Sequence, residues 1–280
     1  MKNIFVLTKI FSKSGKTKML IKDENIDKGK AFDWGRTSAD YAKYRDIYPK
    51  EFYDKIVARG LCQTAGQKVL DIGTGTGVLP RNLYSHGASW TATDISKEQI
   101  EQAKILSAGK NIEYLVSATE DLQFQNGTFD VITACQCFWY FKHEQVAPKF
   151  FKMLKNGGRI LVLYMAWLPF EDKIAGASEN LVLKYSPNWS GAREKIHPIQ
   201  IPEIYSKYFE IVHHEEFPLK VHFTRETWNG RLKACRGIGA SLSKEEIAAW
   251  EREHKKLLEE IAPEEFDVLH YAAMAELKRK

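Results

Sequence analysis

Cysteine is scarce in this chain, and its spacing shows no disulfide framework. Four cysteines occur among 280 residues, and none of them forms a Cys-x-x-Cys pair. Secreted domains that depend on disulfides are much richer in cysteine than this. We therefore predict reduced thiols, a cytoplasmic location and no bound metal. Cys135 and Cys137 stand close together at the end of a predicted strand, where small core filler is favoured over a catalytic or metal-binding role.

The sequence also lacks long hydrophobic runs, and the chain after residue 22 has almost no net charge. No apolar run approaches the ~20 residues that a membrane helix needs, so the sequence predicts no membrane partner. The net charge is +5, but six of the 41 basic residues are lysines within residues 1–22, a stretch with no acid. The rest of the chain has 35 basic against 36 acidic residues, a net of −1. The charge balance therefore predicts no nucleic-acid partner.

Residues 1–30 form the basic arm. Its apolar run, residues 4–7, is too short for a signal peptide, and the arm contains no arginine. We favour a disordered arm over a targeting peptide. Residues 1–18 could also be an extension upstream of a natural start at Met19.

The most glycine-rich stretch lacks both common nucleotide-binding fingerprints. Residues 69–77 read Val-Leu-Asp-Ile-Gly-Thr-Gly-Thr-Gly. Val78 stands where a dinucleotide loop requires its last glycine, and no Gly-Lys-Ser/Thr follows as in a P-loop. What remains is a buried strand that ends in an acid, a glycine turn that allows close approach, and a helix start with free N–H groups. This combination suits a ligand with a zwitterionic tail and a ribose better than a ligand with a pyrophosphate.

A second acid follows the next predicted strand. Residues 89–94 alternate weakly and end in Asp94, whose carboxylate could accept two hydrogen bonds from a ribose diol. Ile95 offers an apolar surface to a purine, and Ser96 is a plausible N-cap for a helix to about residue 107. An acid at a helix N-terminus is common without any ligand, so Asp94 needs support from its neighbours.

That support comes from a series of motifs that resembles the class I S-adenosylmethionine (SAM)-dependent methyltransferases. Residues 71–77 are similar to their first motif, and Asp94 to their ribose-binding acid. Residues 117–124 are similar to the adenine-binding stretch, 129–136 resemble the fourth strand, and 153–161 resemble the turn into the fifth. The resemblance implies SAM as the cofactor. The implied cofactor-binding residues are Asp71, Gly73, Thr74, Gly75, Asp94, Ile95, Ala118, Thr119, Glu120, Cys135 and Gln136.

The motifs lie in a segment where strand and helix patterns alternate, which predicts a doubly wound, mostly parallel, Rossmann-like α/β sheet of seven strands. We place the core at residues 31–167, including an N-terminal helical cover. The expected strands are 68–72, 89–94, 112–116, 129–134, 158–165 and 209–214, with a last strand within 266–277. Residues 266–277 could also be a helix, but the resemblance favours a strand, with an antiparallel place at the sheet edge as one arrangement. The resemblance also implies that Tyr41 and Arg45 cover SAM. Equally, Tyr41 could pack its helix onto the core and Arg45 could be a cation on the surface.

Two insertions are expected to form a mainly helical substrate cap. They are residues 168–208 and, within the closing segment 209–280, residues 224–263. Both would leave from the carboxyl ends of the strands, where ligands bind in open α/β sheets. The predicted pocket residues are Trp139, Tyr140, Trp167, Trp189, Trp228 and Arg231. Trp139 and Tyr140 could equally be core aromatics.

The predicted activity is in-line methyl transfer from SAM to a small-molecule acceptor, most simply a carboxylate or a hydroxyl. Residues 136–141 and 239–242 resemble the trans-aconitate methyltransferase group, although Trp139 stands where that group often has a histidine. A carboxylate acceptor needs no general base, whereas a hydroxyl does. Candidates for that base are His143, His197 and His270, with Tyr140 as a weaker option.

Two other functions stay open. A nucleic-acid methyltransferase often carries Asn/Asp-Pro-Pro-Tyr or Pro-Cys at the fourth strand, and residues 134–137 carry neither. A SAM-binding protein without catalytic activity would show the same cofactor motifs. The chain could be a monomer or a homodimer.

Overall fold

A computed structural model describes residues 6–11 and 17–280. Within the arm expected to be disordered, strands β1 (Val6–Phe11) and β2 (Thr17–Lys22) form an antiparallel pair. The backbone of Ile21 exchanges two hydrogen bonds with Phe32, at 2.9 and 3.0 Å, which fastens the end of the arm. The expectation of disorder is therefore corrected for these residues, and the rest of the arm lies outside the described part of the chain.

The chain divides into two compact units. One consists of the described residues up to Ile47 with Trp167–Lys195 and Lys220–His270, and the other of Tyr48–Ala166, Ile196–Leu219 and Tyr271–Lys280. The sequence assigns residues 31–47 to the core, but the structure groups them with the two insertions. The reason is a set of long-range contacts, such as the hydrogen bond of 2.6 Å from the Arg36 guanidinium to the Leu242 carbonyl.

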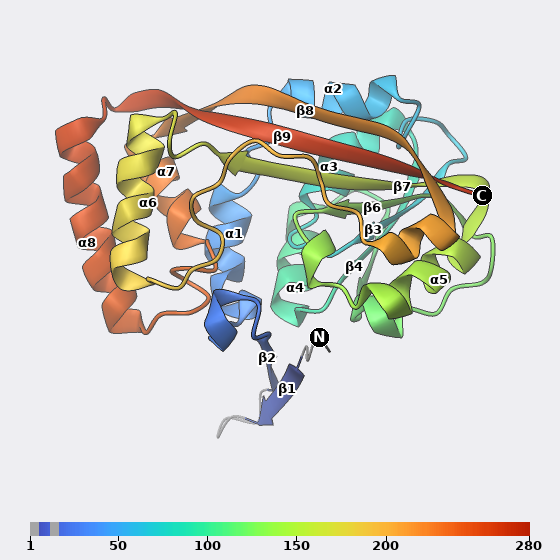
Figure 1. Cartoon of the computed structure of the whole chain (residues 1–280), viewed down its shortest axis with the longest axis horizontal. Coiled ribbons are helices and arrows are strands. Elements are labelled where there is room, and N and C mark those ends of the chain that lie inside the picture. Colours follow the sequence, from blue (N-terminus) through green and yellow to red (C-terminus); the bar gives the residue numbers. More distant parts are fainter. Residues whose placement is uncertain (1–5, 12–16) are drawn as a thin grey trace. The chain divides into compact units, whose positions relative to one another are not determined.

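A seven-stranded sheet runs through the chain in the order β5-β4-β3-β6-β7-β9-β8 (Figure 1). The pairs β3–β4, β3–β6, β4–β5 and β6–β7 are all parallel. This confirms the predicted doubly wound, mostly parallel α/β fold. The strands are β3 (Lys68–Ile72), β4 (Ser89–Asp94), β5 (Ile112–Val116), β6 (Phe129–Cys135), β7 (Leu154–Trp167), β8 (Phe209–Thr224) and β9 (Glu265–Arg279).

The central strand β3 has apolar residues on both faces because helices cover the sheet on both sides. Val69, Leu70 and Ile72 are at most 1% exposed. Ser96 caps α4 as predicted, its hydroxyl accepting a hydrogen bond of 3.2 Å from the Gln99 N–H. The helices of this unit are α2 (Lys50–Ala58), α3 (Val78–Leu83), α4 (Lys97–Leu106) and α5 (His143–Met153).

The end of the sheet differs from the prediction. The last segment is a strand, as the resemblance favoured, but β9 lies between β7 and β8, and β8 forms the edge. β8 is also longer than the expected 209–214. Phe217, Leu219, Val221 and Phe223 are buried and alternate with exposed residues, which is the period of a strand with one solvated face.

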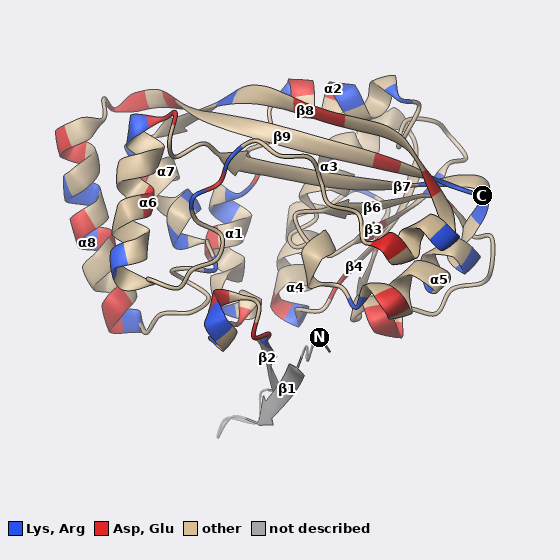
Figure 2. Cartoon of the chain, viewed as in Figure 1, with Lys and Arg blue, Asp and Glu red and all other residues tan. Residues whose placement is uncertain are grey.

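The other unit is mainly helical. Its helices α7 and α8 pack together, with α1 against α7 and α6 against α8. Trp250, His254 and Leu258 form the buried face of α8, and Figure 2 shows charges of both signs along the rest of this helix. The helices are α1 (Ser38–Tyr44), α6 (Lys173–Tyr185), α7 (Arg225–Lys233) and α8 (Lys244–Ile261).

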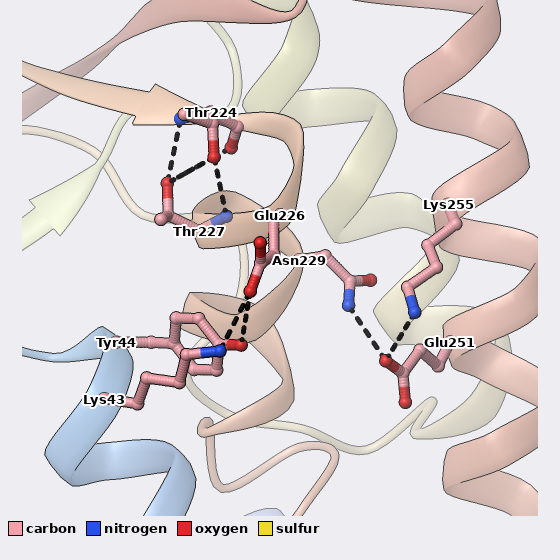
Figure 3. Close-up of polar contacts among 8 residues, drawn as sticks. All are labelled: Lys43, Tyr44, Thr224, Glu226, Thr227, Asn229, Glu251 and Lys255. Atoms are coloured by element: carbon pink, nitrogen blue, oxygen red, sulfur yellow. Dashed lines mark hydrogen bonds and ion pairs between the residues drawn. The ribbon is translucent and has the colours of Figure 1, made fainter.

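Helix α7 begins with a reciprocal cap (Figure 3). The Thr224 hydroxyl accepts a hydrogen bond of 3.1 Å from the Thr227 N–H, and the Thr227 hydroxyl accepts one of 2.8 Å from the Thr224 N–H. Glu226, one residue into the helix, accepts hydrogen bonds from Lys43 and Tyr44 of α1. The contact between α1 and α7 is therefore partly polar and exposed.

Among the helices of the described residues, none combines the length and the apolar character required to cross a membrane.

Candidate functional site

The glycine loop joins β3 to α3 and needs its glycines for their backbone conformation. Gly73, Gly75 and Gly77 have φ angles of +62°, +57° and +75°, a region that side chains disfavour. A Cβ on Gly73 would lie 2.7 Å from the Cβ and Sγ of Cys137. The loop is tied to β4 by a hydrogen bond of 2.9 Å from the Thr74 N–H to the Thr93 carbonyl.

Asp94 ends β4 directly beside this loop. One carboxylate oxygen accepts a hydrogen bond of 2.8 Å from the Gly75 N–H, and the other accepts one of 2.8 Å from the Ser96 N–H. Burial raises the pKa of Asp94, and its hydrogen bonds to backbone N–H groups oppose that rise. The backbone N–H of Ile95 also acts on this carboxylate. The two oxygens together have four lone pairs, so the carboxylate keeps capacity for a further donor.

Asp71 lies under the loop and is 1% exposed. Its Oδ1 accepts a hydrogen bond of 2.6 Å from the Thr133 hydroxyl on the neighbouring strand. Burial raises the pKa of Asp71 to about 6, against the opposing hydrogen bond from Thr133. The sequence predicts a cofactor contact here. The geometry gives Asp71 a second role, which is to join β3 and β6 beneath the loop.

The predicted adenine stretch follows β5 at the same edge of the sheet. Asp94 pairs with Val116 in the strand register, and the Ser117 N–H donates to the Asp94 carbonyl at 2.9 Å. This places Ala118 and the residues after it next to β4. The Glu120 carboxylate accepts a hydrogen bond of 2.9 Å from the Lys142 N–H, so it anchors the segment after β6.

β6 ends here at Cys135, and Gln136 follows it directly. Cys135 Sγ lies 3.4 Å from the Tyr48 hydroxyl. Gln136 has a φ of +63°, unusual for a residue other than glycine, and its side chain donates to the Met165 carbonyl at 2.5 Å. Such strained positions cost about 1–3 kcal/mol and gather at functional sites. The structure therefore brings the predicted residues of β3, β4, β5 and β6 together at one sheet edge.

An aromatic group follows β6. Trp139 is 43% exposed, and its ring meets Tyr164 edge-on at 5.0 Å. Tyr140 lies 5.9 Å from Trp139, and His197 lies 6.1 Å from Tyr164. The exposure of Trp139 rules out a core role for that ring, and the group is well placed as a wall beside the strand ends.

The candidate bases differ in their surroundings. His143 packs 4.8 Å from Phe138, and its Nδ1 lies 3.2 Å from the Tyr205 hydroxyl. Burial lowers the pKa of His143 to about 4, which suits an aromatic cluster better than proton transfer at neutral pH. His197 is exposed and belongs with Tyr140 to the surroundings of Trp139 and Tyr164.

The remaining predicted residues lie in the mainly helical unit. Arg45 donates a hydrogen bond of 3.1 Å to the Tyr41 hydroxyl, and its guanidinium lies 4.6 Å from the centre of that ring. The two residues thus form a local pair. Their predicted contacts with the cofactor stay predictions.

The four predicted cap residues form one cluster. Trp167 lies 6.0 Å from Trp189 and 5.6 Å from Trp228, and the Arg231 guanidinium lies 5.0 Å from the Trp167 ring. None of the four is more than 8% exposed. Glu179 accepts a hydrogen bond from the Trp167 indole at 2.8 Å. The cluster is the packed core of this unit, and a role in an acceptor pocket stays a prediction.

Sequence reasoning missed several residues of the site. Tyr48 is one of them, and it contacts Cys135 from the segment before α2. Cys137, by contrast, was expected as small core filler, and it is buried where it packs on Gly73. The Thr76 hydroxyl is buried in the glycine loop and has no partner within the described residues. The alternation of threonine with glycine in this loop is a signal that could have drawn attention to Thr76.

Comparison with known proteins agrees with this geometry. Residues 70–162 match the family model of the methyltransferase domain. This range covers β3 to β7, which carry the glycine loop, Asp94 and the residues after β6.

Curated relatives match over a similar stretch. A ubiquinone biosynthesis O-methyltransferase from Vibrio atlanticus (strain LGP32) is 32% identical over 143 residues, which are 49% of this chain and 60% of that protein. Another from Xanthomonas euvesicatoria pv. vesicatoria (strain 85-10) is 28% identical over 132 residues, 45% of this chain and 54% of that protein. The chain thus spans about half the length of these two relatives.

Among solved structures, the YcgJ protein of Bacillus subtilis is similar to this chain. It is 16% identical, with a TM-score of 0.47, over 83% of this chain and all of that one.

Proposed function

We propose that this chain, which carries a methyltransferase domain over residues 70–162, is a SAM-dependent methyltransferase that acts on a small-molecule acceptor. The observation that carries the proposal is the pairing of the glycine loop with Asp94. Gly75 donates to a carboxylate that keeps lone-pair capacity for a further donor, such as a ribose hydroxyl.

A buried hydroxyl in the glycine loop is a second observation that fits SAM. The Thr76 hydroxyl is 1% exposed within the loop and has no partner among the described residues. A buried polar atom without a partner costs roughly 1–3 kcal/mol. A polar ligand at the loop would remove that cost, whereas a loop that only turned the chain would gain nothing from a threonine here.

Each part of the site has a task in this proposal. Asp94 holds the ribose, Ile95 and the segment Ala118–Glu120 flank the base, and Gly73, Thr74 and Gly75 allow close approach. Cys135 and Gln136 end β6 at the same edge, next to the path to the acceptor. When bound, SAM supplies a methyl group already activated by a sulfonium. The protein's own contribution is then to align the acceptor and exclude water, worth about 7–11 kcal/mol in favourable cases.

We propose that the acceptor lies against Trp139 and is methylated on oxygen. An exposed indole beside Tyr164 offers a flat apolar wall. Relatives named as O-methyltransferases of ubiquinone biosynthesis are consistent with such an acceptor. For a hydroxyl acceptor, His197 is the favoured base of the candidates because it is exposed beside Tyr164. The resemblance to the trans-aconitate group remains a narrower prediction.

We also propose a cytoplasmic location, since Cys62, Cys135, Cys137 and Cys235 are all free thiols. A small-molecule acceptor is preferred over nucleic acid because the chain after residue 22 is electrically balanced.

Calorimetric titration with SAM tests the cofactor assignment. Asp94→Asn keeps the size of the side chain but removes its charge and one acceptor, so we expect affinity to fall about 10- to 100-fold, the usual worth of a charge-assisted hydrogen bond. Asp54→Asn, on the exposed face of α2, is the matched control and should bind as the wild type does. Equal affinity in the wild type and Asp94→Asn would refute the assignment.

A panel of small carboxylic acids, phenols and quinols with methyl-labelled SAM tests the acceptor class. Labelled product from at least one of them is expected, at a rate insensitive to salt. Methyl transfer to nucleic acid alone, or SAM binding with no transfer to any acceptor, would favour one of the two alternative functions.

A further inference from the structure

The amino ends of the parallel strands surround a polar cavity that has no part in the proposed methyl transfer. Its volume is about 200 Å³, more than ten times what one water molecule requires. It lies between the segment after α2 and the starts of β3, β6 and β7. The lining residues are Arg59, Gly60, Leu61, Gln67, Asp130, Val131, Asn156, Gly157, Gly158 and Arg159.

Two of these residues converge on one carboxylate. The guanidinium groups of Arg59 and Arg159 both bind Glu276 of β9, through Nε and Nη1 respectively, one to each carboxylate oxygen. The Glu276 side chain is fully buried, whereas those of the arginines are 27% and 34% exposed. The carboxylate therefore holds the two guanidinium groups side by side at the cavity wall.

The charges of this wall do not cancel. Glu276 offsets one of the two arginines, and Asp130 is already paired with Lys155 at 2.7 Å. One positive charge is left over. Each guanidinium also has five N–H donors and uses one on Glu276, with no other hydrogen bond found for either in the described residues. Two partly exposed guanidinium groups with free donors are typical of a site for a tetrahedral oxyanion.

The cavity is well separated from the glycine loop. β3 begins at the cavity, directly after Gln67, and ends at the loop with Ile72. Its five residues span about 16 Å at ~3.3 Å each. A ligand in the cavity therefore does not compete with one at the loop.

From these observations we propose that this cavity is a second ligand site, which binds a phosphate group through Arg59 and Arg159. The ligand is either free phosphate or a phosphate monoester, since both present the same oxyanion. The proposal does not depend on methyl transfer.

Asn156 provides a matched pair of variants, because it is exposed and lines the cavity without touching Glu276. Asn156→Glu places a carboxylate beside the arginines, whereas Asn156→Gln has nearly the same size and no charge. We expect the full-length wild type to bind inorganic phosphate saturably, with one site, in calorimetry at low ionic strength. Asn156→Glu should weaken that binding at least about tenfold, and Asn156→Gln should stay within about twofold of the wild type.

Further titrations identify the ligand and the site at which it binds. Glycerol 3-phosphate that binds more tightly than inorganic phosphate indicates a monoester, and equal or weaker binding indicates free phosphate. Acetate should bind at least about tenfold more weakly than phosphate, because it offers fewer acceptor oxygens. Saturating SAM should leave phosphate binding unchanged.

Four results would each overturn the proposal. The wild type could fail to bind phosphate up to about 20 mM, or Asn156→Glu could bind it as tightly as Asn156→Gln does. Acetate could bind as tightly as phosphate, or SAM could displace phosphate. The last result would place the phosphate at the glycine loop.

Discussion

Gly73→Ala is the substitution whose cost the structure defines most sharply. Two independent penalties meet at this position. The φ angle of +62° disfavours any residue with a Cβ, and the new Cβ would lie 2.7 Å from the side chain of Cys137. Real Cβ atoms essentially never approach another heavy atom that closely, so the loop or the turn after β6 must shift.

The two penalties have different sizes. A left-handed backbone costs an alanine about 1–2 kcal/mol relative to glycine. Forcing an extra methyl group into a packed site typically costs a further 1–3 kcal/mol. We therefore expect Gly73→Ala to lower the free energy of unfolding by about 2–5 kcal/mol. SAM affinity should also fall, because the loop that moves is the one that donates to Asp94.

Gly127 is the natural control. Its φ of +65° is nearly the same, but a Cβ there would meet nothing within 4 Å. Gly127→Ala should therefore cost only the backbone penalty, about 1–2 kcal/mol. Urea unfolding followed by circular dichroism measures both variants, and calorimetry measures their affinity for SAM.

A double-mutant cycle isolates the overlap. In a Cys137→Gly background the obstructing side chain is absent, so Gly73→Ala should cost no more than Gly127→Ala does. The same cost for Gly73→Ala in both backgrounds, or a cost in the wild type equal to that of Gly127→Ala, would show that the overlap with Cys137 contributes nothing.

Two further predictions concern charge and capping. The pKa of Asp71 is about 6 in the folded protein, against an ordinary 3.8, so its contribution to stability is present below about pH 4 and is lost as pH rises through 6. Urea unfolding between pH 4 and 7 measures this decline in the free energy of unfolding, which is at most about 3 kcal/mol. Asp71→Asn should remove it, and the same pH profile in the variant and the wild type would contradict the raised pKa of Asp71. Thr224→Ala, which removes the cap of α7, should cost about 1 kcal/mol in the same assay. Glu226→Gln should cost less than Thr224→Ala because the contacts of Glu226 with Lys43 and Tyr44 are exposed to solvent. A larger loss for Glu226→Gln than for Thr224→Ala would contradict this ranking.

The parts of the fold that sequence patterns predicted are those that depend on local features. The strands β3, β4 and β5 occur at the predicted residues. In each case the apolar period and the end signals lie within a few residues of one another. β8 was underestimated because its alternation continues past Pro218, a residue that usually ends a central strand but is tolerated at an edge.

The glycine loop and the acid after β4 were also legible in the sequence. Their spacing follows from the turn of one βα unit and the end of the next strand, and parallel strands bring their carboxyl ends to one edge. The four cap residues were a different case. Trp167, Trp189, Trp228 and Arg231 come together in one cluster with no more than 8% exposure, and aromatic composition alone did not predict that packing. Their role in an acceptor pocket stays a prediction.

The sequence by itself determined the alternation of strands and helices from β3 to β7 and the glycine loop after β3, because both rest on short-range periodicity and on backbone freedom at glycine. Only the tertiary structure decided that Cys137 fills the space over Gly73, that β9 lies inside the sheet, and that Arg59 and Arg159 meet at Glu276. The last contacts join residues 217 and 117 positions apart. Such convergence depends on how whole elements pack, and no local pattern in the chain records it.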